Sequence, residues 1–117
     1  MLDIMTLREY AANVDEAVKR CMNNEAFYLR MVKMAAADKN FERLSSALAA
    51  QDWKGAFEAA HALKRILGNL ALDPMLKPAT ALTELLRPQQ PLEPAQYAEL
   101  LSEIEAQKAK FDEIIGQ

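Results

Sequence analysis

Apolar residues recur at every third or fourth position along most of the chain, which is the period of an amphipathic α-helix. The longest such pattern covers about five helical turns. It follows Asp52, whose carboxylate can cap the first turn of a helix. We therefore expect a long central helix with one apolar face. That face contains Trp53, Phe57, Ala60, Leu63, Leu67 and Leu70.

The same spacing, interrupted by turn-forming residues, predicts further helices on both sides of the central one. We expect two short helices within residues 5–22 and longer ones at about 25–37, 41–51, 53–71, 74–87 and 94–115. The helices at 25–37 and 41–51 are expected to form a hairpin, and 88–94 is a proline-containing linker. This order predicts one all-α domain over residues 1–117. Its expected form is an antiparallel up-down four-helix bundle, covered by the short N-terminal helices and partly extended by the first or last long helix.

Composition and charge narrow the functional classes. The 117 residues are 51% hydrophobic and 26% charged, which is typical of one globular domain, and only three glycines and five prolines interrupt the helical pattern. Fourteen basic and 17 acidic residues give a net charge of −3, which argues against nucleic acid or an anionic membrane as a partner. No apolar run is long enough for a signal or membrane-spanning segment, so we expect a cytoplasmic protein.

Most catalytic chemistries lack the residues they need. The chain has one cysteine, Cys21, and one histidine, His61, so a structural zinc site is excluded. We interpret Cys21 as a small core residue. The three glycines are isolated, so no phosphate-binding loop exists, and nothing in the sequence links His61 to a nucleophilic serine. We therefore expect no enzyme activity of the chain's own and no metal site.

Helical geometry places His61 away from the predicted apolar face. At about 100° per residue, the centre of that face lies roughly 90° or more from His61, so the imidazole is expected to face solvent. Lys64 and Arg65 follow at the spacing that brings helical side chains back over the ring. A solvated imidazole is mostly neutral at pH 7 and keeps a ring nitrogen for attack. Gly68 removes bulk from the same face, so this face suits a phosphoryl group.

The same residues also have a plainer interpretation. A lone histidine on a helix surface is usually only a polar residue. Gly68 can serve close helix packing, and Lys64 and Arg65 can be solvated charges. The pattern alone therefore leaves the function open.

Residues 59–72, AAHALKRILGNLAL, resemble the signature of the histidine-containing phosphotransfer (HPt) domains of bacterial phosphorelays. The family pattern is His-x-Leu-Lys-Gly, commonly followed by Gly-Asn-Leu-Gly. The likeness extends from Phe27 to Arg87 and implies a four-helix bundle with an exposed phospho-accepting histidine. The matching residues are His61, Leu63, Lys64, Gly68, Asn69 and Leu70.

Two positions depart from the family pattern. Arg65 stands where the family usually has a glycine four residues after the histidine, and Ala71 replaces the last glycine of Gly-Asn-Leu-Gly. In the family the first glycine leaves room for the partner's active site to close over the ring. The Arg65 guanidinium either obstructs that docking or swings aside and holds the phosphoryl oxygens.

The resemblance implies that His61 accepts a phosphoryl group from an aspartyl phosphate on a response-regulator receiver domain and passes it to another receiver. Lys64 would stabilise the phosphoryl oxygens, and Mg²⁺ would come from the receiver's acidic pocket, so we expect no cofactor of the chain's own. Other expected partners include a hybrid sensor histidine kinase. The residues expected to contact the partner are Lys54, Glu58, Ala62, Arg65 and Gly68.

Two further expectations accompany this interpretation. Because the chain starts at Met1 and ends soon after its last predicted helix, we expect a free-standing domain. We expect a monomer, since a carrier must expose one face to its partners. The alternative function is an HPt-like docking module that cannot be phosphorylated and that binds or inhibits a receiver or kinase domain. Arg65 is the feature that favours it.

Overall fold

The structure is a computed structural model that describes residues 2–11 and 13–116, and over these residues it consists of helices and connecting turns. The prediction of an all-α bundle is therefore confirmed. None of these helices has both the length and the apolar character needed to cross a bilayer. In chain order the helices are α1 (Ile4–Tyr10), α2 (Val14–Arg20), α3 (Glu25–Ala36), α4 (Asn40–Ala49), α5 (Trp53–Asn69), α6 (Asp73–Leu86) and α7 (Pro94–Ile115).

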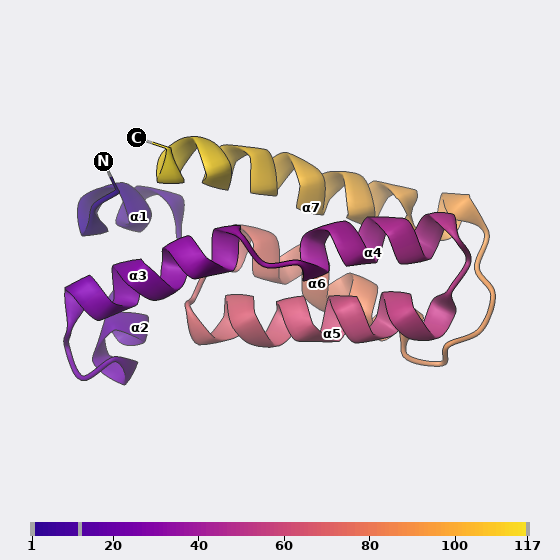
Figure 1. Cartoon of the computed structure of the whole chain (residues 1–117), viewed down its shortest axis with the longest axis horizontal. Helices are drawn as coiled ribbons and strands as arrows, with labels where there is room; N and C mark the ends of the chain where they lie inside the picture. Colours follow the sequence, from indigo (N-terminus) through magenta and orange to yellow (C-terminus); the bar gives the residue numbers. More distant parts are fainter. Residues whose placement is uncertain (1, 12, 117) are drawn as a thin grey trace.

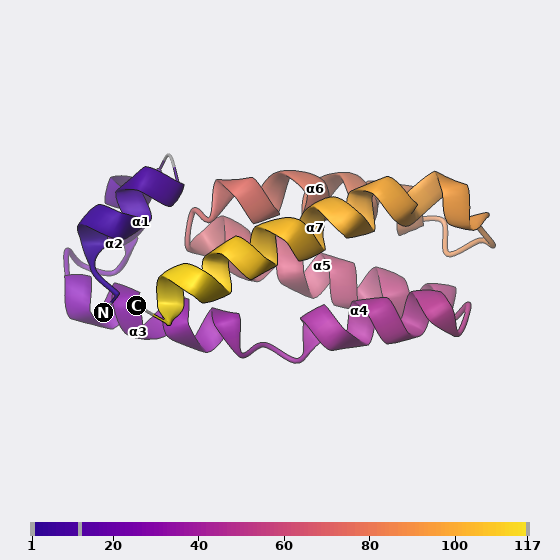
Figure 2. The ribbon, with the colours of Figure 1, turned by 90° about the horizontal axis from the view of Figure 1, so that it is seen from above.

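Helices α4, α5, α6 and α7 run alternately up and down along the longest axis of the molecule (Figures 1 and 2). Helix α5 packs between α4 and α6, and α7 packs mainly against α6, on the far side of the bundle from α5. Helices α1 and α2 lie at the end of the bundle where α5 finishes, close to α3 (Figure 1). This arrangement is the expected bundle with a cover of short N-terminal helices.

Helices α3 and α4 do not form the predicted hairpin. They follow one another in nearly the same direction, and α3 extends beyond the end of α5 (Figures 1 and 2). The break between them is short, and the Asp38 carboxylate accepts a hydrogen bond from the backbone N–H of Asn40 at 2.8 Å. The two helices pack on different neighbours. Helix α5 covers the apolar face of α4, whereas α3 packs mainly against α7 and α2, so the chain does not reverse here.

A side-chain cap fixes the first turn of α5, and backbone hydrogen bonds end its last turn. The Asp52 carboxylate accepts a hydrogen bond from the backbone N–H of Gly55 at 2.9 Å, as the sequence predicts for this cap. At the other end, the N–H of Leu72 donates to the carbonyl of Leu67 at 2.9 Å, and Ala71 takes a left-handed backbone with φ of 56°. Any residue with a Cβ atom is strained in this conformation by about 1–2 kcal/mol, which explains why the family pattern has a glycine at this position.

The packing face of α5 is built largely from small residues. Short side chains let neighbouring helices approach closely, because the distance between helix axes depends on the side chains at the contact. Leucines further along the same face fill the space between α4 and α6. The fully buried residues of this face are Ala56, Ala59, Ala60, Leu63 and Leu67.

Helices α2 and α3 supply hydrogen-bond donors to backbone carbonyls at the C-terminal end of α5. The buried hydroxyl of Tyr28 on α3 donates to the carbonyl of Leu70 at 2.7 Å. The Arg20 guanidinium on α2 donates to the carbonyls of Gly68 at 3.2 Å and Asn69 at 3.4 Å. Because the last carbonyls of a helix have unused acceptor capacity, these bonds tie α2 and α3 to α5.

Replacing Tyr28 with phenylalanine is expected to lower the free energy of unfolding by about 1–2 kcal/mol, because the buried Leu70 carbonyl loses its donor. Urea denaturation at pH 7 measures this change. Tyr97→Phe is the control, since Tyr97 is half-buried and no described residue hydrogen-bonds its hydroxyl. Equal effects of the two substitutions would contradict a role for the bond between Tyr28 and Leu70.

The Tyr28→Phe variant is also expected to change how the stability of the fold depends on alkaline pH. Burial raises the pKa of Tyr28 from its ordinary value near 10 to about 12, so the folded state favours the neutral hydroxyl. The stabilisation that the folded state gains from the neutral Tyr28 hydroxyl is complete below pH 10. It is lost as the pH rises from about 10 to about 12. Tyr28→Phe is therefore expected to lose less stability than the wild type between pH 9 and pH 12.

Candidate functional site

His61 lies near the middle of α5, beside the packing face, and is half-buried. Its ring centroid is 5.7 Å from that of Phe57, with 33° between the ring planes. Phe57, which the sequence predicts on the apolar face, packs against the core but is only half-buried. The two residues are one turn apart and differ by only about 40° around the helix, so they share an edge. Trp53 is also only half-buried.

The residues expected to contact a partner lie along the same helix as His61. Lys54, Glu58 and Arg65 are exposed, whereas Ala62 and Gly68 are half-buried. The Glu58 carboxylate is 2.7 Å from the Arg43 guanidinium on α4, so its charge is already paired.

Arg65 is the exposed cation one turn beyond His61. Among residues 2–11 and 13–116, no carboxylate lies within 4 Å of its guanidinium. Its side chain is therefore available to a bound group, and it also occupies the space that the family pattern leaves open.

Lys64 faces α6 and takes part in a charged cluster that the helical pattern does not predict. Its ammonium is 3.7 Å from the carboxylate of Glu84 on α6. The same carboxylate receives two hydrogen bonds from Arg87, at 2.8 and 3.1 Å. The Arg87 guanidinium lies over the Phe57 ring, 5.5 Å from its centroid.

A signal for this cluster exists in the sequence. The short turn between α5 and α6 fixes the register of two antiparallel helices, so residues at equal distances before and after it face one another. By this rule Phe57 lies opposite Leu85, within one turn of Arg87, whereas Lys64 lies opposite Pro78, so the rule predicts only the first of the two contacts. The pair of Glu84 and Arg87, three residues apart on one helix, is itself a predictable ion pair.

The electrostatics of this face differ from those of the whole chain. Hydrogen bonding from Arg87 lowers the pKa of Glu84, and the same bond raises the pKa of Arg87, so both remain ionised at neutral pH. Both carboxylates of the face, Glu58 and Glu84, are paired with cations. Lys54, Lys64, Arg65 and Arg87 belong to this side of α5 or to the cluster beside it, so it carries four cations and two carboxylates.

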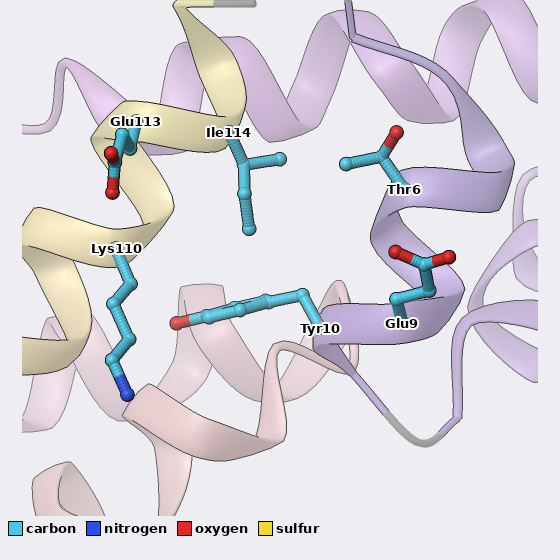
Figure 3. Close-up of a pocket in the computed structure, with 6 residues that line it drawn as sticks. All are labelled: Thr6, Glu9, Tyr10, Lys110, Glu113 and Ile114. Carbon is cyan, nitrogen blue, oxygen red and sulfur yellow. The ribbon is translucent and has the colours of Figure 1, made fainter.

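No group of three potential metal ligands gathers within the part of the chain that the structure describes. A cavity of about 370 Å³ lies away from α5, between α1 and α7 (Figure 3). Glu9 approaches it from α1, and Lys110 and Glu113 approach it from α7. The hydroxyl of Tyr10, whose ring crosses the cavity, donates to the carbonyl of Gln107 at 3.2 Å. The cavity contains none of the residues that surround His61.

The comparisons with known proteins agree with this geometry. The family model described as "Hpt domain" matches residues 29–110, which is more than two thirds of the chain. The matched region contains α4, α5, α6 and most of α3 and α7. No curated protein and no solved structure gives a significant match.

The fold itself does not require a glycine at position 68. A Cβ atom there would meet only the methyl groups of Leu76, at 3.8 and 4.0 Å, which is ordinary contact. Gly68→Ala is therefore expected to raise the free energy of unfolding by about 0.5–1 kcal/mol, the helix-propensity difference. Ala81→Gly, the reverse change at an exposed position of α6, is the control and is expected to lower the free energy of unfolding by a similar amount. If Gly68→Ala destabilises the fold, the glycine serves packing and not an open face.

Proposed function

Because the chain belongs to the Hpt domain family, we propose that His61 receives a phosphoryl group from the aspartyl phosphate of a response-regulator receiver domain and passes it to another receiver. The observation that carries this proposal is the position of His61. The chain's one histidine lies half-buried at the edge of the packing face of α5, and two cations, Lys64 and Arg65, follow it within about one turn of the helix.

The proposed step is an in-line transfer of the phosphoryl group. The ring nitrogen of His61 that carries no proton donates its electron pair to phosphorus, and a P–N bond forms. The P–O bond to the receiver's aspartate breaks at the same time, and the carboxylate leaves with the electron pair of that bond. The reverse exchange with a second receiver restores the neutral imidazole. The cations around His61 stabilise the charge on the phosphoryl oxygens during both exchanges.

The two cations that follow His61 have different roles in this proposal. Lys64 is held toward α6 and stabilises the phosphoryl oxygens from that side. Arg65 has no described carboxylate as a partner and can reach the phosphoryl group from the solvent side. We assign the main stabilising role to Lys64, which matches the family pattern.

The receiver supplies what this chain lacks. Glu58 is paired with Arg43, so the face around His61 offers no free pair of carboxylates for Mg²⁺, and we propose that the receiver's acidic pocket holds the ion. The chain acts as a stoichiometric carrier without kinase activity of its own. We propose that it works as a cytoplasmic monomer between receiver domains, one of which can belong to a hybrid sensor histidine kinase.

Arg65 favours a second candidate function. In this alternative its exposed guanidinium prevents the receiver's active site from closing over His61, and the chain docks to a receiver or kinase domain without accepting phosphate. Such a module would bind its partner equally well with and without the imidazole.

Transfer from a panel of receiver domains, each labelled on its aspartate by acetyl phosphate and Mg²⁺, tests these two functions. We expect acid-labile, alkali-stable label on the wild type and at least a 100-fold loss of label in His61→Gln, because no other histidine is present. Label on His61→Gln equal to that on the wild type would contradict the site. Arg65→Gly is the matched variant, and label on Arg65→Gly but not on the wild type would favour the docking module.

A further inference from the structure

Glu84 on α6 connects two of the cations near His61. One of its carboxylate oxygens lies 3.7 Å from the Lys64 ammonium and 2.8 Å from the Arg87 guanidinium. Its other oxygen accepts a second hydrogen bond from Arg87 at 3.1 Å. Arg87 in turn covers the ring of Phe57, which lies beside His61. A continuous series of contacts therefore joins Glu84 to the nucleophile.

The two contacts of Glu84 differ in strength. The contact with Arg87 has two short hydrogen bonds in the geometry that makes arginine–carboxylate pairs strong. The contact with Lys64 is a single ion pair at 3.7 Å between partly exposed groups, which contributes little to stability. Lys64 is therefore the partner that a new anion can take away from Glu84 without breaking the rest of the cluster.

A phosphoryl group on His61 introduces such an anion. It carries about 1.5 to 2 negative charges at neutral pH. Lys64 lies one turn further along the same helix face, so its ammonium can turn from Glu84 to the phosphoryl oxygens. Glu84 then loses one of its counter-ions and faces a second negative group. Each of these effects raises the free energy of the phosphorylated state relative to the free one.

We infer that Glu84 is a positioning residue that competes with the phosphoryl group for Lys64 and so keeps the phosphoryl group on His61 easy to transfer. The inference rests on the proposed phosphotransfer function and adds a residue that sets its equilibrium. A carrier has to release the group that it accepts. A nearby carboxylate that withholds Lys64 moves the equilibrium toward the aspartyl phosphate of the next receiver.

The equilibrium between phospho-receiver and phospho-His61 measures this effect. We would use the receiver from the panel above that transfers fastest, freed from acetyl phosphate and mixed in equal amounts with each variant. Glu84→Gln is expected to raise the ratio of phospho-His61 to phospho-receiver about three- to tenfold. Glu103→Gln, which removes an exposed charge from α7 on the far side of the bundle, is the matched control and is expected to leave the ratio within twofold.

Two further variants separate competition from structural damage. Glu84→Asp keeps the charge and is expected to restore the wild-type ratio to within about twofold. In a Lys64→Met background, Glu84→Gln is expected to raise the ratio about twofold or less, because the contested cation is gone. A loss of packing would lower the extent of phosphorylation, so an increase cannot come from damage to the fold.

Several results would overturn the inference. One is a ratio for Glu84→Gln that equals that of Glu103→Gln or falls below the wild type. Another is an equally large rise of the ratio when Glu84→Gln is made in the Lys64→Met background. That result would show that Glu84 only repels the phosphoryl group and does not compete with it for Lys64. If the wild type accepts no label from any receiver, the proposed function fails and the inference fails with it. A labelled wild type with an unchanged Glu84→Gln ratio overturns the inference alone.

Discussion

The close packing of the alanine face of α5 is the constraint on which the rest of the structure depends. Small side chains such as Ala56, Ala59 and Ala60 hold this helix between α4 and α6. Side chains advance about 100° per residue around a helix, so the residues next to this packed face lie at its partly exposed edge. The same packing that stabilises the bundle therefore keeps His61 at the surface and fixes its height along the bundle.

Helix α6 contributes to the site through the same contact. Because α5 and α6 are antiparallel and joined by a short turn, the end of α6 lies beside the first half of α5. This register brings Glu84 to Lys64 and places Arg87 over Phe57. The result is a face whose cations and carboxylates are already arranged before any partner binds. Such preorganisation is valuable in phosphoryl transfer, where catalysis depends mainly on positioning and on charge stabilisation.

Much of the fold could be predicted from the sequence because its information is local. Periodicity and caps such as Asp52 mark the helices, and the His61 motif indicates the family. The direction of α3 relative to α4 could not be predicted in this way, because a three-residue break is compatible with either a reversal or a continuation. The contacts of Phe57 and Glu84 depend on how α6 lies against α5, which hydrophobic periodicity alone does not specify. Careful use of the helical angle would still have moved Phe57 to the edge that it shares with His61.

The central claim is that the imidazole on the open face of α5 carries the phosphoryl group. The most direct measurement is a ³¹P NMR spectrum of the chain labelled with ¹⁵N only in its histidine, recorded after transfer from a phosphorylated receiver. The account predicts a new phosphorus signal that is split by a directly bonded nitrogen, since His61 is the one histidine in the sequence. A phosphorus signal without this splitting would place the group on another side chain and contradict the account.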